Sequence, residues 1–127
     1  MMVSAVRIAG RRVLVVEDEY LLANRIAGEF TKLGVETIGP ANTVERALDL
    51  VKHGGHLDGA VLDIKVRGDM VFPVAEALRA RGVPFVFATG YDQQAIPDRY
   101  SDVAHHQKPL NLAQVLRALW SDAGHMP

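Results

Sequence analysis

The apolar residues of this chain form short unbroken runs that alternate with segments of helical spacing. Residues 12–16 read Arg-Val-Leu-Val-Val and lead directly into three acids. An unbroken run of branched apolar residues is typical of a strand buried on both faces of a sheet. In residues 19–33 the apolar positions instead share one helical stripe, and Gly34 stands where a helix would end. The first unit is therefore predicted to be a strand followed by a helix.

The same alternation continues along the chain. Further strands are predicted at residues 36–39, 59–63, 85–88 and 103–108, the last being polar enough for a sheet edge. One helix is predicted to follow a capping box formed by Asn42 and Glu45. The next is predicted to start at Pro73, and the last to follow Asn111. Strands that alternate with helices indicate a parallel sheet covered on both faces, joined by right-handed crossovers.

One segment breaks this alternation. Between Thr89 and Val103 the apolar residues follow no sustained stripe, and Pro97 interrupts the segment. We therefore expect a loop with at most one short turn there, and a fourth helix that is reduced or absent.

Composition narrows the class of protein. The 127 residues are 49% apolar, which is enough for one domain, residues 1–127, with its core at about 11–120. Fourteen basic residues offset fifteen acidic ones, so no strong positive field is available to bind nucleic acid. The chain has no cysteine, which excludes disulfides and thiolate chemistry. No apolar run resembles a signal peptide or a membrane span, so we expect a cytoplasmic protein that binds no membrane.

The polar residues that end the predicted strands suggest chemistry. In an open parallel sheet the ligand crevice lies beyond the carboxyl ends of the strands. Glu17 and Asp18 follow the first strand, Asp63 ends the third, Thr89 follows the fourth and Lys108 follows the fifth. A nucleotide site would need glycine-rich amide donors after the first strand, where this chain has acids that repel phosphate. The candidate site therefore joins carboxylates, a hydroxyl and an ammonium.

Clustered carboxylates are costly unless a cation neutralises them. A few oxygen ligands completed by water suit Mg²⁺, which commonly pairs carboxylates with a phosphate. In such a site Asp63 could attack phosphorus and become an acyl phosphate. Lys108 and the metal would neutralise the phosphoryl oxygens, and Thr89 would donate a hydrogen bond.

With these motifs the sequence resembles the receiver domains of bacterial two-component response regulators, over residues 12–119. Receivers carry an acidic pair after the first strand, a phosphoacceptor Asp after the third, Thr or Ser after the fourth and Lys-Pro after the fifth. The matching positions here are Glu17 with Asp18, Asp63, Thr89, and Lys108 with Pro109.

The resemblance implies a flavodoxin-like, doubly wound sheet of five parallel strands in the order 2-1-3-4-5. It also implies that Asp18, Asp63 and the backbone carbonyl of Lys65 bind Mg²⁺, with Glu17 acting through water. The Lys108–Pro109 peptide bond is expected to be cis.

Two features depart from the usual receiver pattern. His105 stands where receivers usually have Phe or Tyr, and the fourth helix is reduced. However, residues 84–91 resemble a subgroup with the motif Phe-x-Phe-Ala-Thr-Gly-Tyr, common as stand-alone proteins in alphaproteobacteria. We therefore expect that Tyr91, rather than His105, reorients when Thr89 moves toward a phosphoryl group.

The resulting hypothesis is a stand-alone response regulator, not an enzyme in the ordinary sense. It would accept a phosphoryl group on Asp63 from a histidine kinase or a phosphotransfer protein, and then relay it or change its binding to a downstream protein. About seven residues follow Trp120, so no output domain is expected. One alternative is a pseudo-receiver that is never phosphorylated. Another is a small-substrate phosphatase, which would want a second acid where Lys65 stands.

Overall fold

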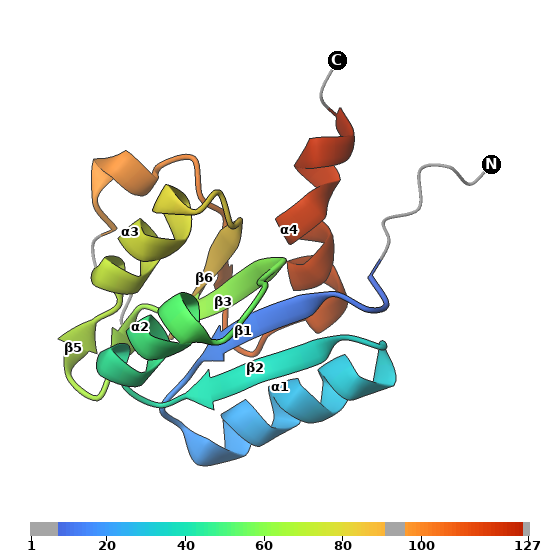
Figure 1. Ribbon diagram of the computed structural model, residues 1–127, viewed down its shortest axis with the longest axis horizontal. Helices are drawn as coiled ribbons and strands as arrows, with labels where there is room; N and C mark the ends of the chain where they lie inside the picture. Colours follow the sequence, from blue (N-terminus) through green and yellow to red (C-terminus); the bar gives the residue numbers. More distant parts are fainter. Residues whose placement is uncertain (1–7, 91–95, 126–127) are drawn as a thin grey trace.

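The computed structural model describes residues 8–90 and 96–125, and its centre is a parallel sheet of five strands (Figure 1). The order β2-β1-β3-β6-β7 confirms the predicted order, because β6 and β7 are the fourth and fifth strands of this sheet. The strands are β1 (Arg12–Val16), β2 (Glu36–Ala41), β3 (Gly59–Asp63), β6 (Phe85–Thr89) and β7 (His105–Gln107).

Helices cover both faces of the sheet. They are α1 (Tyr20–Lys32), α2 (Val44–His53), α3 (Phe72–Ala80) and α4 (Leu112–His125). Leu14 and Val16 of β1 belong to the core that includes α2 and α3, whereas Val13 and Val15 belong to the core that includes α1 and α4. Successive strand residues point to opposite faces, so a strand buried on both sides must be apolar throughout. No helix within the described ranges has the length and apolar character needed to cross a membrane.

The residues that cap α4 and α2 in the structure can be compared with the predicted capping residues. The Asn111 side chain accepts a hydrogen bond from the Gln114 N–H at 3.1 Å, which confirms the cap of α4. The predicted capping box at Asn42 is wrong, because Thr43 caps α2 and accepts from the Arg46 N–H at 3.0 Å. The strand β2 extends through Ala41, two residues further than predicted, and this moves the start of the helix along the chain.

Residues 65–70, between the third predicted strand and the helix predicted to start at Pro73, form a short antiparallel hairpin. Its strands are β4 (Lys65–Val66) and β5 (Asp69–Met70). The two turn residues, Arg67 and Gly68, have φ values of 50° and 86°. Positive φ at both central residues is the geometry that tight two-residue hairpins require. The hairpin is anchored in the core by Val66, which is fully buried.

The described part of the segment between β6 and β7 agrees with the prediction that the fourth helix is reduced or absent. In its described part, residue 90 and residues 96–104, the helical structure is a single 3-10 turn, η1 (Asp98–Tyr100). Tyr100 is buried and stacks on Phe72 with ring centroids 5.4 Å apart. Arg79 of α3 binds Asp102 at 3.0 Å. Within residues 96–104, a turn attached to α3 in this way is thus present instead of a packed helix.

An acidic crevice at the carboxyl edge of the sheet

The predicted site residues gather at one edge of the sheet because all five strands are parallel. One carboxylate oxygen from each of Glu17, Asp18 and Asp63 lies within 4.8 Å of the others. Glu17 and Asp18 follow β1 and Asp63 ends β3, and these two strands are direct neighbours. Thr89 ends β6, on the other side of β3, and its carbonyl accepts from the Lys108 N–H at 2.8 Å. The strand ends therefore meet as predicted.

Lys108 forms ion pairs with two of the three acids. Its Nζ lies 3.1 Å from Glu17 Oε1 and 3.2 Å from Asp63 Oδ2. Glu17 and Asp63 are both buried, at 3% and 8% exposure, so these charges are poorly screened by water. Among the described residues, one ammonium against three carboxylates leaves the crevice with excess negative charge.

This excess charge appears in the pKa values. Burial and, after it, the neighbouring Asp63 carboxylate raise the pKa of Glu17 to about 7, although the Glu19 N–H and Lys108 oppose the shift. Burial also raises the pKa of Asp63 above its usual range, although Lys108 opposes the shift. Burial alone would lower the pKa of Lys108, but the carboxylates of Asp63 and Glu17 hold it above its ordinary value. The negative charge of the buried acids is therefore unfavourable, and an added cation would stabilise it.

The donor set fits Mg²⁺. All the candidate ligands are oxygens, and clustered carboxylates with space for water are typical of hard dications. Glu17 already uses both oxygens, one for Lys108 and one for the Glu19 N–H at 3.0 Å. Asp18 accepts only from the Arg67 N–H, through Oδ2 at 2.8 Å, so its Oδ1 has no hydrogen-bond partner among the described residues. This difference favours Asp18 as a direct ligand and agrees with an indirect role for Glu17.

The Thr89 side chain has an unsatisfied hydroxyl within the part of the chain that the structure describes. Its Oγ1 is buried and forms no hydrogen bond with any residue in the described ranges. A buried hydroxyl without a partner costs stability, so its retention needs an explanation. A ligand oxygen entering the crevice would supply the missing acceptor.

The remaining predicted site residues are less constrained by the structure. The Lys65 side chain is exposed on β4, and His105 is exposed on the edge strand β7. An exposed imidazole is a poor plug for an apolar cavity, as the sequence suggests. Tyr91 lies outside the described residues. The Lys108–Pro109 bond is cis, as the resemblance implies.

One contact at the site was not anticipated from the sequence. The N–H of Arg67, at the tip of the β4–β5 hairpin, donates to Asp18. The signal for it was Arg67-Gly68, a pair suited to a two-residue turn, between residues that could pair as strands. Runs of two residues carry too little periodicity to be recognised as strands.

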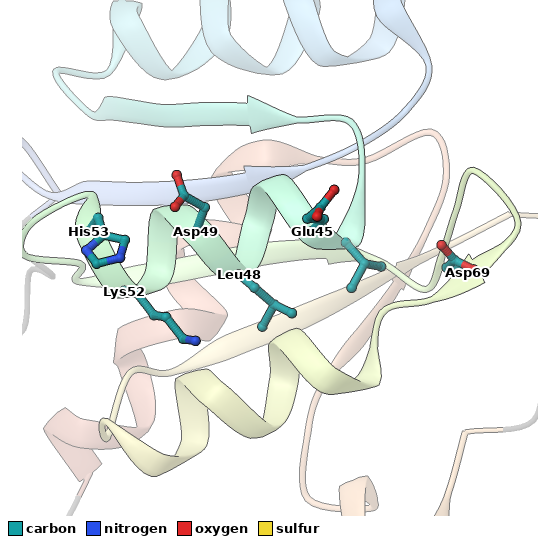
Figure 2. Close-up of a pocket in the computed structure, with 7 residues that line it drawn as sticks. Glu45, Leu48, Asp49, Lys52, His53 and Asp69 are labelled. Atoms are coloured by element: carbon teal, nitrogen blue, oxygen red, sulfur yellow. The ribbon is translucent and has the colours of Figure 1, made fainter.

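A second hollow lies over α2 and does not share this chemistry. Figure 2 shows that its labelled side chains come from α2 and from Asp69 of the hairpin. None of the strand-end acids lines it. The hollow that adjoins Lys108 is a different one, lined also by Glu19, Leu21, Leu22, Arg25, Gly90 and Pro109.

Comparison with known proteins shows which proteins this chain resembles in sequence and in fold. A scan against models of protein families finds no match. The solution structure of SdrG from Sphingomonas melonis Fr1 is 38% identical, with a TM-score of 0.77 over 90% of this chain and 98% of that protein. The transcriptional regulatory protein TcrA of Mycobacterium tuberculosis is 33% identical over 95% of this chain and 50% of the relative. A CheY-like response regulator receiver domain from Methanospirillum hungatei shares the fold at 18% identity, with a TM-score of 0.72.

The sheet order and the covering helices define a flavodoxin-like α/β protein. Within that class, the chain belongs to the response regulator receiver domains, which are signalling modules of two-component systems. It spans about half the length of the curated relatives that it matches.

Proposed function

We propose that this protein is a response regulator receiver, with Asp63 as its phosphoacceptor and Mg²⁺ as its cofactor. The observation that carries the proposal is the buried Asp63 carboxylate, which lies in a crevice with two further acids and one lysine. Its supporting features are the Thr89 hydroxyl, which has no hydrogen-bond partner among the described residues, and the family to which the chain belongs.

In the proposed reaction, a carboxylate oxygen of Asp63 attacks the phosphorus of a phosphohistidine on the partner. The new O–P bond forms as the P–N bond breaks, and the imidazole leaves and takes up a proton. Asp18, Asp63 and the Lys65 carbonyl would hold Mg²⁺, with Glu17 acting through water, and the ion would neutralise the phosphoryl charge. Lys108 would follow the added charge of about −1.5 to −2, and Thr89 would donate to a phosphoryl oxygen.

We propose the exposed start of α1 as the surface that receives the phosphodonor. Tyr20 and Leu21 are 75% and 76% exposed, which is unusual for large apolar side chains on a small domain. Leu21 also lines the hollow beside Lys108, together with Pro109. A helical partner with an apolar face could dock here and bring its phosphohistidine to Asp63. We expect this partner to be a histidine kinase or a histidine phosphotransfer protein.

Output is proposed to pass through the segment after β6 to a downstream protein. SdrG has been solved in a BeF₃-activated conformation, and BeF₃ is a mimic of a phosphoryl group. When Asp63 of this chain carries a phosphoryl group or BeF₃, we expect Thr89 to move toward that group and Tyr91 to reorient. BeF₃-induced NMR shifts in residues 96–105 should be lost in Tyr91→Ala and kept in His105→Ala. The reverse result would assign the switch to His105.

A phosphotransfer experiment tests the donor side of the proposal. Purified histidine kinases and phosphotransfer proteins, labelled on histidine, should transfer label to the wild-type protein and not to Asp63→Asn. Leu21→Asp should abolish this transfer while leaving labelling by acetyl phosphate intact. Leu33→Asp, at the residue that follows the last turn of α1, is the control and should behave as wild type. Transfer that is unaffected by Leu21→Asp would remove α1 as the docking surface.

A further inference from the structure

The β4–β5 hairpin reaches the acidic crevice through its turn. Arg67 is the first of the two turn residues, and its backbone N–H lies 2.8 Å from Asp18 Oδ2. No ion pair contacts Asp18 within the described ranges, whereas Glu17 and Asp63 both contact Lys108. The Arg67 amide is therefore the group that fixes the orientation of the Asp18 carboxylate.

The hairpin is built to hold that amide in place. Arg67 has a φ of 50° and is the one non-glycine residue with positive φ in the described chain. A non-glycine residue in this region is strained, so the surrounding structure must hold it there. The fully buried Val66 precedes the turn and the fully buried Val71 follows the hairpin, and the Val71 N–H donates to the Ile64 carbonyl at 2.8 Å.

The pairing of β4 with β5 leaves the Lys65 carbonyl without a hydrogen bond to the opposite strand of the hairpin. The Val71 N–H donates to the Ile64 carbonyl, which marks this position of the ladder as a hydrogen-bonding one, although the Ile64 N–H donates to the Ala88 carbonyl. Pairs in an antiparallel ladder alternate, so the next pair, Lys65 and Met70, is not hydrogen-bonded across the hairpin. The carbonyl and N–H of Lys65 consequently point away from Met70.

We infer that the Arg67-Gly68 turn is a positioning device for the metal site, in which the Arg67 N–H holds one oxygen of Asp18 and leaves the other for Mg²⁺. This inference rests on the proposed function, because it assigns Asp18 as a magnesium ligand. Outer partners that orient ligating carboxylates commonly change metal affinity tenfold or more when they are removed. Arg67 acts through its backbone, so its side chain is dispensable.

Replacing Arg67 by its α-hydroxy acid tests the inference, since the ester exchanges only the N–H for an oxygen. Magnesium affinity, titrated with the metal alone, should fall roughly tenfold. The matched control is the same ester at Gly68, whose N–H donates to no acceptor in the described ranges. That control and Arg67→Gly, which keeps the N–H and tolerates positive φ, should bind Mg²⁺ within about twofold of wild type. An Arg67 ester with unchanged affinity would overturn the inference.

A metal-free measurement keeps the test independent of folding and of the proposed function. Amide exchange at Arg67 should quicken at least about tenfold in Asp18→Ala, while exchange at Val71 stays unchanged. Unchanged exchange at Arg67 would show that the contact does not constrain Asp18. If wild-type protein instead bound no Mg²⁺ at all, the proposed metal site would fail, and the exchange result would still report on the contact.

Discussion

Asp58 and Asp63 lie at opposite ends of the same strand, and their surroundings shift their pKa values in opposite directions. Asp58 precedes β3 at the amino edge of the sheet, and Asp63 ends it at the carboxyl edge. Burial alone would raise the pKa of Asp58, but the Arg12 N–H, His56 and Arg11 hold it below its ordinary value. For Asp63 burial prevails, and the pKa is raised.

The geometry explains the difference. Asp58 accepts from the Arg12 N–H at 2.9 Å and contacts the His56 ring at 2.8 Å, and Arg11 lies 3.9 Å away. Its carbonyl accepts from the Trp120 ring N–H at 2.9 Å, which ties the last helix to the strand. Asp63 has one lysine and faces two further carboxylates. An aspartate that is surrounded by hydrogen-bond donors and basic side chains stabilises the fold. An aspartate that is buried beside other acids and has a raised pKa is instead a candidate for a functional role.

The largest effect should come from the amino edge. Asp58→Ala should lower the free energy of unfolding by about 2 kcal/mol. The reason is that the Arg12 N–H and the side chains of His56 and Arg11 lose the carboxylate that they contact. Urea unfolding followed by circular dichroism measures this value. Asp49→Ala, on the exposed face of α2, is the control and should change stability little. A cost for Asp58→Ala no larger than for the control would remove the structural role.

The same change at the carboxyl edge should have the opposite sign. In metal-free buffer at pH 8, Asp63→Asn should raise the free energy of unfolding by on the order of 1 kcal/mol, because it removes one of three mutually repelling charges. Excess magnesium should reverse the ranking of wild type and variant, because only wild type has the complete ligand set. A destabilised Asn variant in metal-free buffer would contradict the comparison.

The pH dependence of stability should separate the two edges further. The folded pKa of Glu17, about 7, exceeds its ordinary value of 4.5, so the folded state holds a proton that the unfolded state has released. Its contribution is complete below 4.5 and is lost as pH rises to about 7. Asp58, with a lowered pKa, contributes above its ordinary value of 3.8 and loses this contribution as pH falls. Glu17→Gln should flatten the metal-free stability profile between pH 4.5 and 7, and an unchanged slope would contradict the assignment.

How much of this was predictable differs between the two edges. Parallel strands bring their carboxyl ends together, so Glu17, Asp63 and Lys108 could be placed in one site from the strand pattern alone. The partners of Asp58 come from three separate segments, and no motif marks them. Its structural role therefore emerges only from the folded chain.

The burial of Tyr100 illustrates the same limit elsewhere. Its neighbours Phe72 and Phe87 lie on α3 and β6, far away in the sequence. A lone aromatic in an irregular segment has no periodicity, and only tertiary packing decides its burial. The start of α2 was misplaced for a local reason, because Asn42 and Thr43 are both good cap residues and the extent of β2 chooses between them.

The smallest expected effect is on stability at Thr89. Thr89→Val keeps the shape of the side chain and removes a buried hydroxyl that has no partner in the described structure. The free energy of unfolding should stay equal or rise by up to about 1 kcal/mol. The BeF₃-induced NMR shifts of the variant should nevertheless be lost. A clear loss of stability would show that the hydroxyl has a structural role instead.

Intact-protein mass spectrometry after incubation with magnesium and acetyl phosphate tests the central claim most directly. The wild-type protein should gain one phosphoryl group, Asp63→Asn should gain none, and Asp58→Asn should be labelled as wild type wherever it remains folded. Circular dichroism of each variant before labelling establishes that it is folded. Equal labelling of wild type and Asp63→Asn would contradict the assignment of Asp63 as the phosphoacceptor.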